Sequence, residues 1–310
     1  MDTEGLLAQL AGRGYRAQVV PASRLPDLHE AVARWHRQGV LDDELYQGYL
    51  SGFDPAPPAG LEARSLIILA SPSPPVRVLF GHRGQQVPAT IPPTYLWQAP
   101  RAAELALLAE ALGPAGYRAE RANVPLKFLA VCSGLARYGR NNITYLPGRG
   151  SFHRLAAYYS DLPCDAHPWH EPQMLEACAH CTACLRRCPT GAIVADRFLV
   201  CAERCLTWFN ERDVALPPWA ESAPHNALVG CMLCQRACPE NRPFEGWFAP
   251  GPQFTEEETA LLLQGPEAGE LPEETRAKLA ALDWSLDERQ VLARNLGLLL
   301  ARAESRRGGR

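Results

Sequence analysis

Eight cysteines in the middle of the chain follow the spacing of iron–sulfur cluster ligands. The first run reads Cys178-x2-Cys181-x2-Cys184-x3-Cys188-Pro189, and a shorter second run reads Cys231-x2-Cys234-x3-Cys238-Pro239. In chains with two clusters, the fourth cysteine of such a run binds the other cluster. The spacing therefore predicts two [4Fe-4S] clusters, the first bound by Cys178, Cys181, Cys184 and Cys238 and the second by Cys188, Cys231, Cys234 and one further thiol.

The spacing alone does not identify this further thiol. A second run of standard length would begin with a cysteine at position 228, where this chain has Leu228. Upstream of that position, Cys201 and Cys205 are the two candidates that remain.

Structural zinc and disulfide bonds are the alternative explanations for such a cysteine-rich segment. Zinc closes its site with four ligands, so one zinc site would leave four thiols unused, and two would not require this spacing. Disulfides suit exported proteins, whereas the N-terminus, Met1-Asp2-Thr3-Glu4, does not resemble a signal peptide. We therefore expect clusters and a cytoplasmic location, and we expect no membrane-spanning segment.

Length and composition show that the clusters occupy only part of the protein. A chain of 310 residues with 47% hydrophobic residues can bury more than one core. The formal net charge of -3 argues against a strongly cationic surface. The N-terminal half must therefore have a role of its own.

The pattern of apolar residues predicts a mixed α and β structure. A continuous apolar run at 66–70 predicts a buried strand, and 76–80 with 85–91 predicts a hairpin. Capping-box patterns begin helices at 255–258 and 285–288 near the C-terminus. Helical periodicity predicts further helices at 4–13, 27–50, 101–112, 126–132 and 151–160.

Together with the cluster motif, three segments resemble the epoxyqueuosine reductase-like family, which is related to reductive dehalogenases. These segments are 133–142, Gly150-Ser151 and 160–163. The resemblance implies an α+β fold: a nitroreductase-like mixed α/β cobalamin and substrate domain at 1–165, a double [4Fe-4S] ferredoxin-like domain at 166–250, and a helical extension at 251–310. It also selects Cys205 over Cys201 as the eighth cluster ligand. The cobalamin-binding residues that it implies are Ser133, Gly134, Leu135, Arg137, Tyr138, Gly139, Asn141, Gly150 and Ser151.

The chain departs from the family pattern around its expected catalytic acid. The family has an aspartate ahead of the glycine-rich segment, and an ungapped alignment places Glu120 there. Tyr158 and Asp161 are further candidate proton donors. Ala136, Arg137 and Arg140 replace the usual residues of the glycine-rich segment, so the chain resembles a divergent paralogue.

These observations lead to a main hypothesis and two alternatives. The resemblance implies a reductase that passes electrons from an external donor, such as a ferredoxin or flavodoxin, through two clusters to cobalamin, which reduces a small-molecule or nucleoside-like substrate. The first alternative is a cobalamin-free electron-transfer or metallocofactor assembly protein. Reduction of epoxyqueuosine in tRNA is a weaker alternative, because the acidic net charge and the short C-terminal region do not favour tRNA as a partner.

Overall fold

The computed structural model describes residues 1–53, 56–96, 98–283 and 289–308, which form two compact units. The first unit consists of Met1–Ser73, Gln98–Thr182 and Ile193–Ala202. The second consists of Pro74–Trp97, Ala183–Ala192 and Glu203–Arg310. The chain therefore passes between the units several times.

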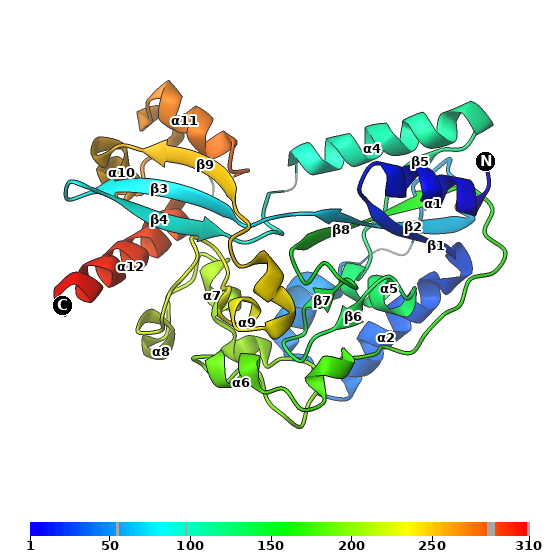
Figure 1. Cartoon of the computed structure of the whole chain (residues 1–310), viewed down its shortest axis with the longest axis horizontal. Helices are drawn as coiled ribbons and strands as arrows, with labels where there is room; N and C mark the ends of the chain where they lie inside the picture. Colours follow the sequence, from blue (N-terminus) through cyan, green and yellow to red (C-terminus); the bar gives the residue numbers. More distant parts are fainter. Residues whose placement is uncertain (54–55, 97, 284–288, 309–310) are drawn as a thin grey trace. The chain divides into compact units, whose positions relative to one another are not determined.

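A four-stranded antiparallel sheet with the order β1-β2-β8-β5 forms the centre of the first unit (Figure 1). Its strands are β1 (Arg16–Pro21), β2 (Ser65–Pro72), β8 (His153–Ser160) and β5 (Ala119–Arg121). The predicted strand at 66–70 is confirmed as part of β2. Its continuous apolar run reflects burial on both faces of the sheet.

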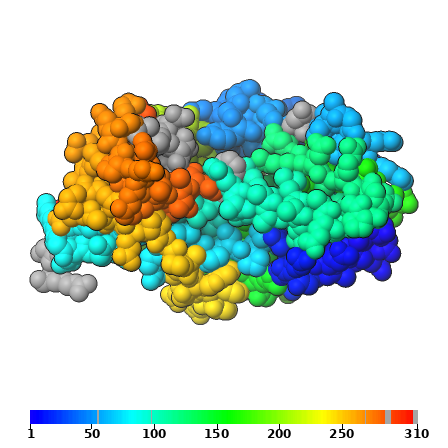
Figure 2. Space-filling model, turned by 90° about the horizontal axis from the view of Figure 1, so that it is seen from above, coloured from blue at the N-terminus to red at the C-terminus, as the bar shows by residue number. Residues whose placement is uncertain are grey.

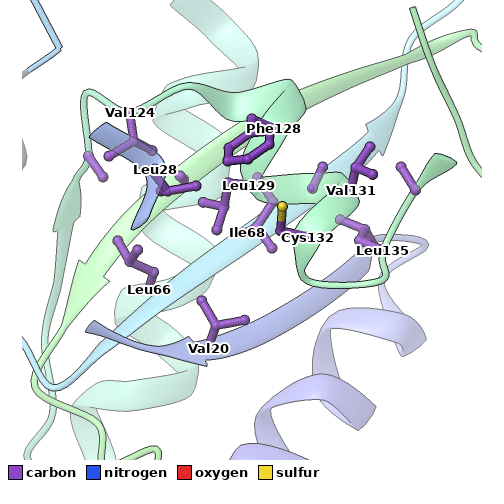
Figure 3. Close-up of a cluster of buried hydrophobic side chains, with 14 of the residues drawn as sticks. Val20, Leu28, Leu66, Ile68, Val124, Phe128, Leu129, Val131, Cys132 and Leu135 are labelled. Atoms are coloured by element: carbon purple, nitrogen blue, oxygen red, sulfur yellow. The ribbon is translucent and has the colours of Figure 1, made fainter. Parts of the chain in front are cut away.

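Helices cover both faces of this sheet. On one face, α1 (Thr3–Gly12) and α4 (Gln98–Leu112) lie side by side (Figure 2). Both helices pack on Ile67 and Leu69. On the other, α2 (Leu25–Arg37) and α5 (Leu126–Cys132) pack on Leu66 and Ile68 (Figure 3). Alternate residues of one strand thus belong to two different cores.

The prediction of a helix at 151–160 is wrong, because β8 occupies His153–Ser160. The strand is paired on both sides, with β2 and with β5, and helices cover both of its faces. A strand buried on both faces carries apolar residues on both, so its sequence lacks the alternation of a half-buried strand. Short apolar runs of this kind are ambiguous between helix and strand.

The prediction of one helix over 27–50 is only partly correct. The helix α2 ends at Arg37, and Gly39 follows at a φ of 67°, which is typical of a helix C-terminus. A short helix, α3 (Asp43–Leu45), and a π-helical turn, η2 (Tyr46–Leu50), complete the segment. The expected helices at 4–13, 101–112 and 126–132 are confirmed within a few residues as α1, α4 and α5.

The second unit contains a three-stranded sheet with the order β4-β3-β9. The predicted hairpin is confirmed as β3 (Val76–His82) and β4 (Gln85–Ile91), and β9 (Ala249–Phe254) adds to β3 in parallel. The strand β9 was not predicted, because Pro250 and Pro252 argue against a strand. Prolines are tolerated there because β9 lies at the edge of the sheet.

The helices of the second unit are short around the cysteines and longer near the C-terminus. The expected capping box is confirmed at the start of α10, where Thr255 and Glu258 bond each other's backbone amides. The second expected box, at 285–288, lies outside the described residues. The helices are α6 (Ala183–Arg187), α7 (Leu206–Asn210), α8 (Pro218–Glu221), α9 (Leu233–Arg236), α10 (Glu256–Leu262), α11 (Glu273–Ala280) and α12 (Arg289–Gly308).

The compact units cut across the expected boundaries at 165 and 250. The hairpin β3–β4 belongs to the second unit because β3 pairs with β9. The functional division into three domains stays a prediction. Among the described residues, no helix has both the length and the apolarity needed to cross a membrane.

Candidate iron–sulfur and cofactor sites

The four thiols expected to bind the second cluster all belong to the second unit. Cys188 follows α6, Cys234 lies on α9, and these two short helices pack together. Cys205 occupies the N-cap of α7. Cys231 directly precedes Met232, the N-cap residue of α9. Short helices and turns thus bring together cysteines that lie up to 46 residues apart in sequence, from 188 to 234.

The electrostatics of these thiols suit a metal cluster. Burial raises the pKa of Cys234 well above its ordinary value, and the nearby thiols of Cys231 and Cys205 raise it further. Burial is also the largest cause of the raised pKa values of Cys205 and Cys231, and Cys188 adds to both. Thiolates held this close repel one another, whereas bound iron replaces the protons and compensates the charge. Four thiolates are the donors that a [4Fe-4S] cluster requires. The assignment of these four cysteines to the second cluster stays a prediction.

The structure explains why Leu228 takes the place of a cysteine. Its side chain is fully buried in the apolar core of the second unit, and its backbone N–H donates to the carbonyl of Thr90 at 2.7 Å. The Leu228 side chain therefore packs against the β3–β4 hairpin. Another part of the chain must supply the fourth thiol. The electrostatic coupling of Cys205 to Cys188 and Cys231 supports Cys205 in that role.

Asn226 supports the second cluster segment and was missed by sequence analysis. Its Nδ2 donates to the Sγ of Cys231 at 3.3 Å, and its Oδ1 accepts from the N–H of Met232 at 2.9 Å. The amide thereby orients the cysteine and stabilises its thiolate form, lowering the pKa of Cys231 against the larger effect of burial. Asparagine at a turn is common, so nothing in the sequence pattern distinguishes this residue.

Tyr95 is a second residue that sequence analysis missed. Its hydroxyl donates to the carboxylate of Glu211 and lies against Gly230, where a Cβ atom would overlap it. Gly230 also has a φ of 66°, so both its backbone conformation and this contact favour glycine before Cys231. Burial raises the pKa of Tyr95 well above its ordinary value, and Glu211 raises it further.

The residues expected to bind the first cluster come from both units. Cys178 and Cys181 belong to the first unit, at and just after the turn η4 (Glu176–Cys178), while Cys184 and Cys238 belong to the second. In the described chain, no three His, Cys, Asp or Glu side chains converge on a single ion position. A cubane binds each cysteine through a different iron atom, so its ligands need no common centre. The assignment of the first cluster stays a prediction.

The glycine-rich segment expected to bind cobalamin follows α5 and runs through β6 (Arg137–Tyr138) into the turn before β7 (Thr144–Tyr145). Gly134, at a φ of 74°, ends α5, and a Cβ there would lie 3.3 Å from the His170 ring. A Cβ at Gly139 would lie 2.5 Å from Tyr145. Internal packing therefore explains both glycines. Gly148, at a φ of 69°, has no atom within 4 Å of a Cβ position, which leaves its backbone open to a ligand.

The other residues expected to bind cobalamin are hydrogen-bonded within the protein, buried or exposed. Ser133 donates to the carbonyl of Ala130 at 3.1 Å, and Asn141 donates to the Tyr145 hydroxyl at 3.0 Å. Arg137, at the start of β6 (Arg137–Tyr138), is exposed. Leu135, Tyr138 and Ser151 are buried, and Gly150 accepts from the N–H of Leu146 at 3.0 Å.

The three candidate proton donors lie in different surroundings. Glu120, half-buried on β5, is paired with Tyr159 and so shares the α5 face of the sheet. Tyr158 lies on the opposite face, where it donates to Glu104 at 2.7 Å. Asp161 accepts from the N–H of Arg118 at 2.7 Å. Of the three, Glu120 alone lies on the sheet face that carries α5 and its glycine-rich extension.

Comparison with known proteins supports the cluster module. Residues 177–241 match the family described as the 4Fe-4S double cluster binding domain. The epoxyqueuosine reductase of Pseudomonas aeruginosa is 33% identical over 101 residues, which cover 32% of this chain and 27% of that protein. The matched region is thus about a quarter of the curated relative's length. These matches confirm the predicted resemblance to the epoxyqueuosine reductase-like family.

Solved structures share the fold over almost the whole chain. Epoxyqueuosine reductase from Bacillus subtilis matches with a TM-score of 0.67 at 21% identity, covering 96% of this chain and 80% of that one. An epoxyqueuosine reductase solved with an epoxyqueuosine-modified tRNA-Tyr stem loop matches with a TM-score of 0.66, at the same identity and coverage. The predicted α+β fold class with an iron–sulfur domain is confirmed.

Proposed function

We propose that this protein is an iron–sulfur oxidoreductase that passes electrons through two [4Fe-4S] clusters to a cobalamin, which reduces a bound substrate. The observation that carries this proposal is the double-cluster match at 177–241 within a chain that otherwise shares the epoxyqueuosine reductase fold. The grouping of the Cys188, Cys205, Cys231 and Cys234 thiols in one unit supports the second cluster.

The chain's own residues have distinct tasks in this proposal. The cysteines hold the clusters, and the segments 133–142 and 148–151 hold the cobalamin, with the open backbone at Gly148 available for close approach. Cobalamin, when bound, supplies the difficult reductive step. Glu120 is the proton donor that we favour, because it lies on the same sheet face as α5, the helix that leads into segment 133–142.

The substrate is proposed at the level of class, as a small-molecule or nucleoside-like compound. The expectation that tRNA is disfavoured finds no support, since a structure with a bound tRNA stem loop has the same fold. Epoxyqueuosine in tRNA is therefore our second candidate substrate. A ferredoxin or flavodoxin remains the proposed electron donor, and the cytoplasm the proposed location.

Anaerobic electron transfer to cobalamin separates this proposal from the cobalamin-free electron carrier. The cluster-loaded protein is reduced, freed of excess reductant and mixed with one equivalent of oxidised cobalamin. We expect the corrinoid bands to change as the cluster absorbance returns, and added epoxyqueuosine-containing tRNA stem loop or free nucleoside then tests the substrate. A protein with intact clusters that neither binds nor reduces cobalamin supports the electron-carrier alternative.

A further inference from the structure

Arg140 joins the glycine-rich segment to the loop that carries two cysteines. Its Nη2 donates to the carbonyl of Cys178 at 2.7 Å, and its Nε donates to that of Cys181 at 3.3 Å. Its Nη1 donates to the carbonyl of Ala195 at 3.4 Å. One guanidinium therefore ties together three points of the first unit, two of which are expected cluster ligands.

A second connection runs through the backbone beside Arg140. The N–H of Tyr138 donates to the carbonyl of Gln173 at 2.9 Å, and the carbonyl of Tyr138 accepts from Leu175 at 2.8 Å. The N–H of Cys178 in turn donates to Leu175 at 2.9 Å. The segment that enters the cysteine loop is thus paired to residue 138, and Arg140 holds the end of the same loop.

The type of side chain matters at this position. Arginine presents several N–H donors in a rigid planar fork, whereas lysine offers a single point charge on a flexible stem. All the acceptors of Arg140 are neutral carbonyls, and none of the ion pairs in the described part of the chain involves it. Among the described residues, its guanidinium therefore lies against backbone carbonyls of the Cys178–Cys181 loop and not against a carboxylate at ion-pair distance. A positive charge beside a cluster stabilises the reduced, more negative state of that cluster.

We infer that Arg140 is a positioning residue for the first cluster: its three hydrogen bonds fix the Cys178–Cys181 loop, and its charge favours the reduced cluster. The inference rests on the proposed first cluster. Reduction transfers one electron from the external donor to the oxidised cluster, which gains one negative charge. A nearby fixed positive charge stabilises that product and raises the reduction potential.

Two substitutions separate the hydrogen bonds from the charge. Arg140→Gln removes the charge and the fork, whereas Arg140→Lys keeps the charge and loses the fork. Arg197→Gln is the matched control, because Arg197 also belongs to the first unit and donates to three carbonyls, those of Val40, Leu199 and Val200. Each protein is reconstituted anaerobically, and its iron content and potentials are measured by an EPR-monitored redox titration.

For R140Q we expect one cluster signal to shift to more negative potential, by about tenfold in the reduction equilibrium or ~59 mV for one electron. R140K should keep the potential but lose iron from that cluster faster in the presence of chelator. R197Q should match the wild-type protein in both respects.

The same potentials and iron loss in all four proteins would overturn the inference. A wild-type protein without two clusters would instead overturn the proposed function. Circular dichroism of the apo proteins identifies a variant that fails to fold. If R140Q fails to fold, the potential and the iron loss of R140K test the inference.

Discussion

At the scale of single residues, one change in the cluster motif links Leu228 and Cys205. Leu228 stands where the motif has a cysteine, and Cys205 is the thiol proposed to replace it. Leu228 is buried in the core of the second unit, so that position contributes packing instead of a ligand. The thiol of Cys205 interacts with those of Cys188 and Cys231, which supports it as the replacement. Spacing alone left Cys201 and Cys205 as equal candidates, and the choice between them depended on tertiary structure or resemblance.

Substitution of these two cysteines gives opposite predictions. Cys205→Ser should abolish the second cluster and reduce the reconstituted iron from about eight to about four atoms per chain. Cys201→Ser should retain both clusters, because Cys201 belongs to the first unit and is a buried apolar thiol there. Iron analysis and EPR spectroscopy distinguish the two variants. Loss of a cluster in C201S with full iron in C205S would show that Cys201 is the ligand.

His153 predicts a pH dependence of stability for the first unit. Burial lowers its pKa from 6.5 to about 4, and its Nε2 lies 2.9 Å from the Thr144 hydroxyl. The unfolded chain therefore takes up a proton below pH 6.5 that the folded protein binds only near pH 4. This contribution to stability is complete above pH 6.5 and falls towards pH 4, by at most about 1.4 kcal/mol per pH unit.

Urea unfolding of the apo protein at pH 7 and pH 5 measures this effect. We expect the wild-type protein to lose stability on acidification and His153→Gln to lose less, whatever its stability at pH 7. An equal loss in both proteins would show that His153 does not carry the pH dependence.

At the scale of elements, the strands of the first unit show where sequence patterns succeed and fail. The run 66–70 was identified because polar residues and prolines bound it, and the helix predicted at 126–132 is α5. The strand β8 was mistaken for a helix, since central pairing and two covered faces remove its alternation. The parallel pairing of β9 with β3 joins residues about 170 positions apart, which no local pattern reveals.

The capping box at the start of helix α10 can be tested by substitution. Thr255 accepts from the N–H of Glu258 at 3.2 Å, and Glu258 accepts from the N–H of Thr255 at 2.7 Å. Thr255→Ala should lower the free energy of unfolding by about 1 kcal/mol through loss of this cap. Thr255→Ser keeps the hydroxyl and should lose much less. Thermal unfolding of the two variants checks the prediction, which equal stabilities would contradict.

At the scale of the whole molecule, the chain interleaves its two compact units and divides the predicted first cluster's ligands between them. Spacing predicted seven of the eight thiols of the cluster module and left Cys201 and Cys205 open for the eighth. It did not predict this division, because the division depends on which unit each loop packs against. The candidate cobalamin segment was reached by resemblance alone. Internal packing explains Gly134 and Gly139, so glycines alone did not identify a ligand site.

We propose that one chain holds two [4Fe-4S] clusters together with cobalamin. The most direct test is anaerobic purification from cells supplied with cobalamin, followed by analysis of iron, sulfide, zinc and corrinoid in the same sample. We expect about eight iron and eight sulfide atoms and about one corrinoid per chain. Zinc with negligible iron would contradict the clusters, and full iron without corrinoid, even after incubation with excess cobalamin, would contradict the cobalamin-dependent reductase.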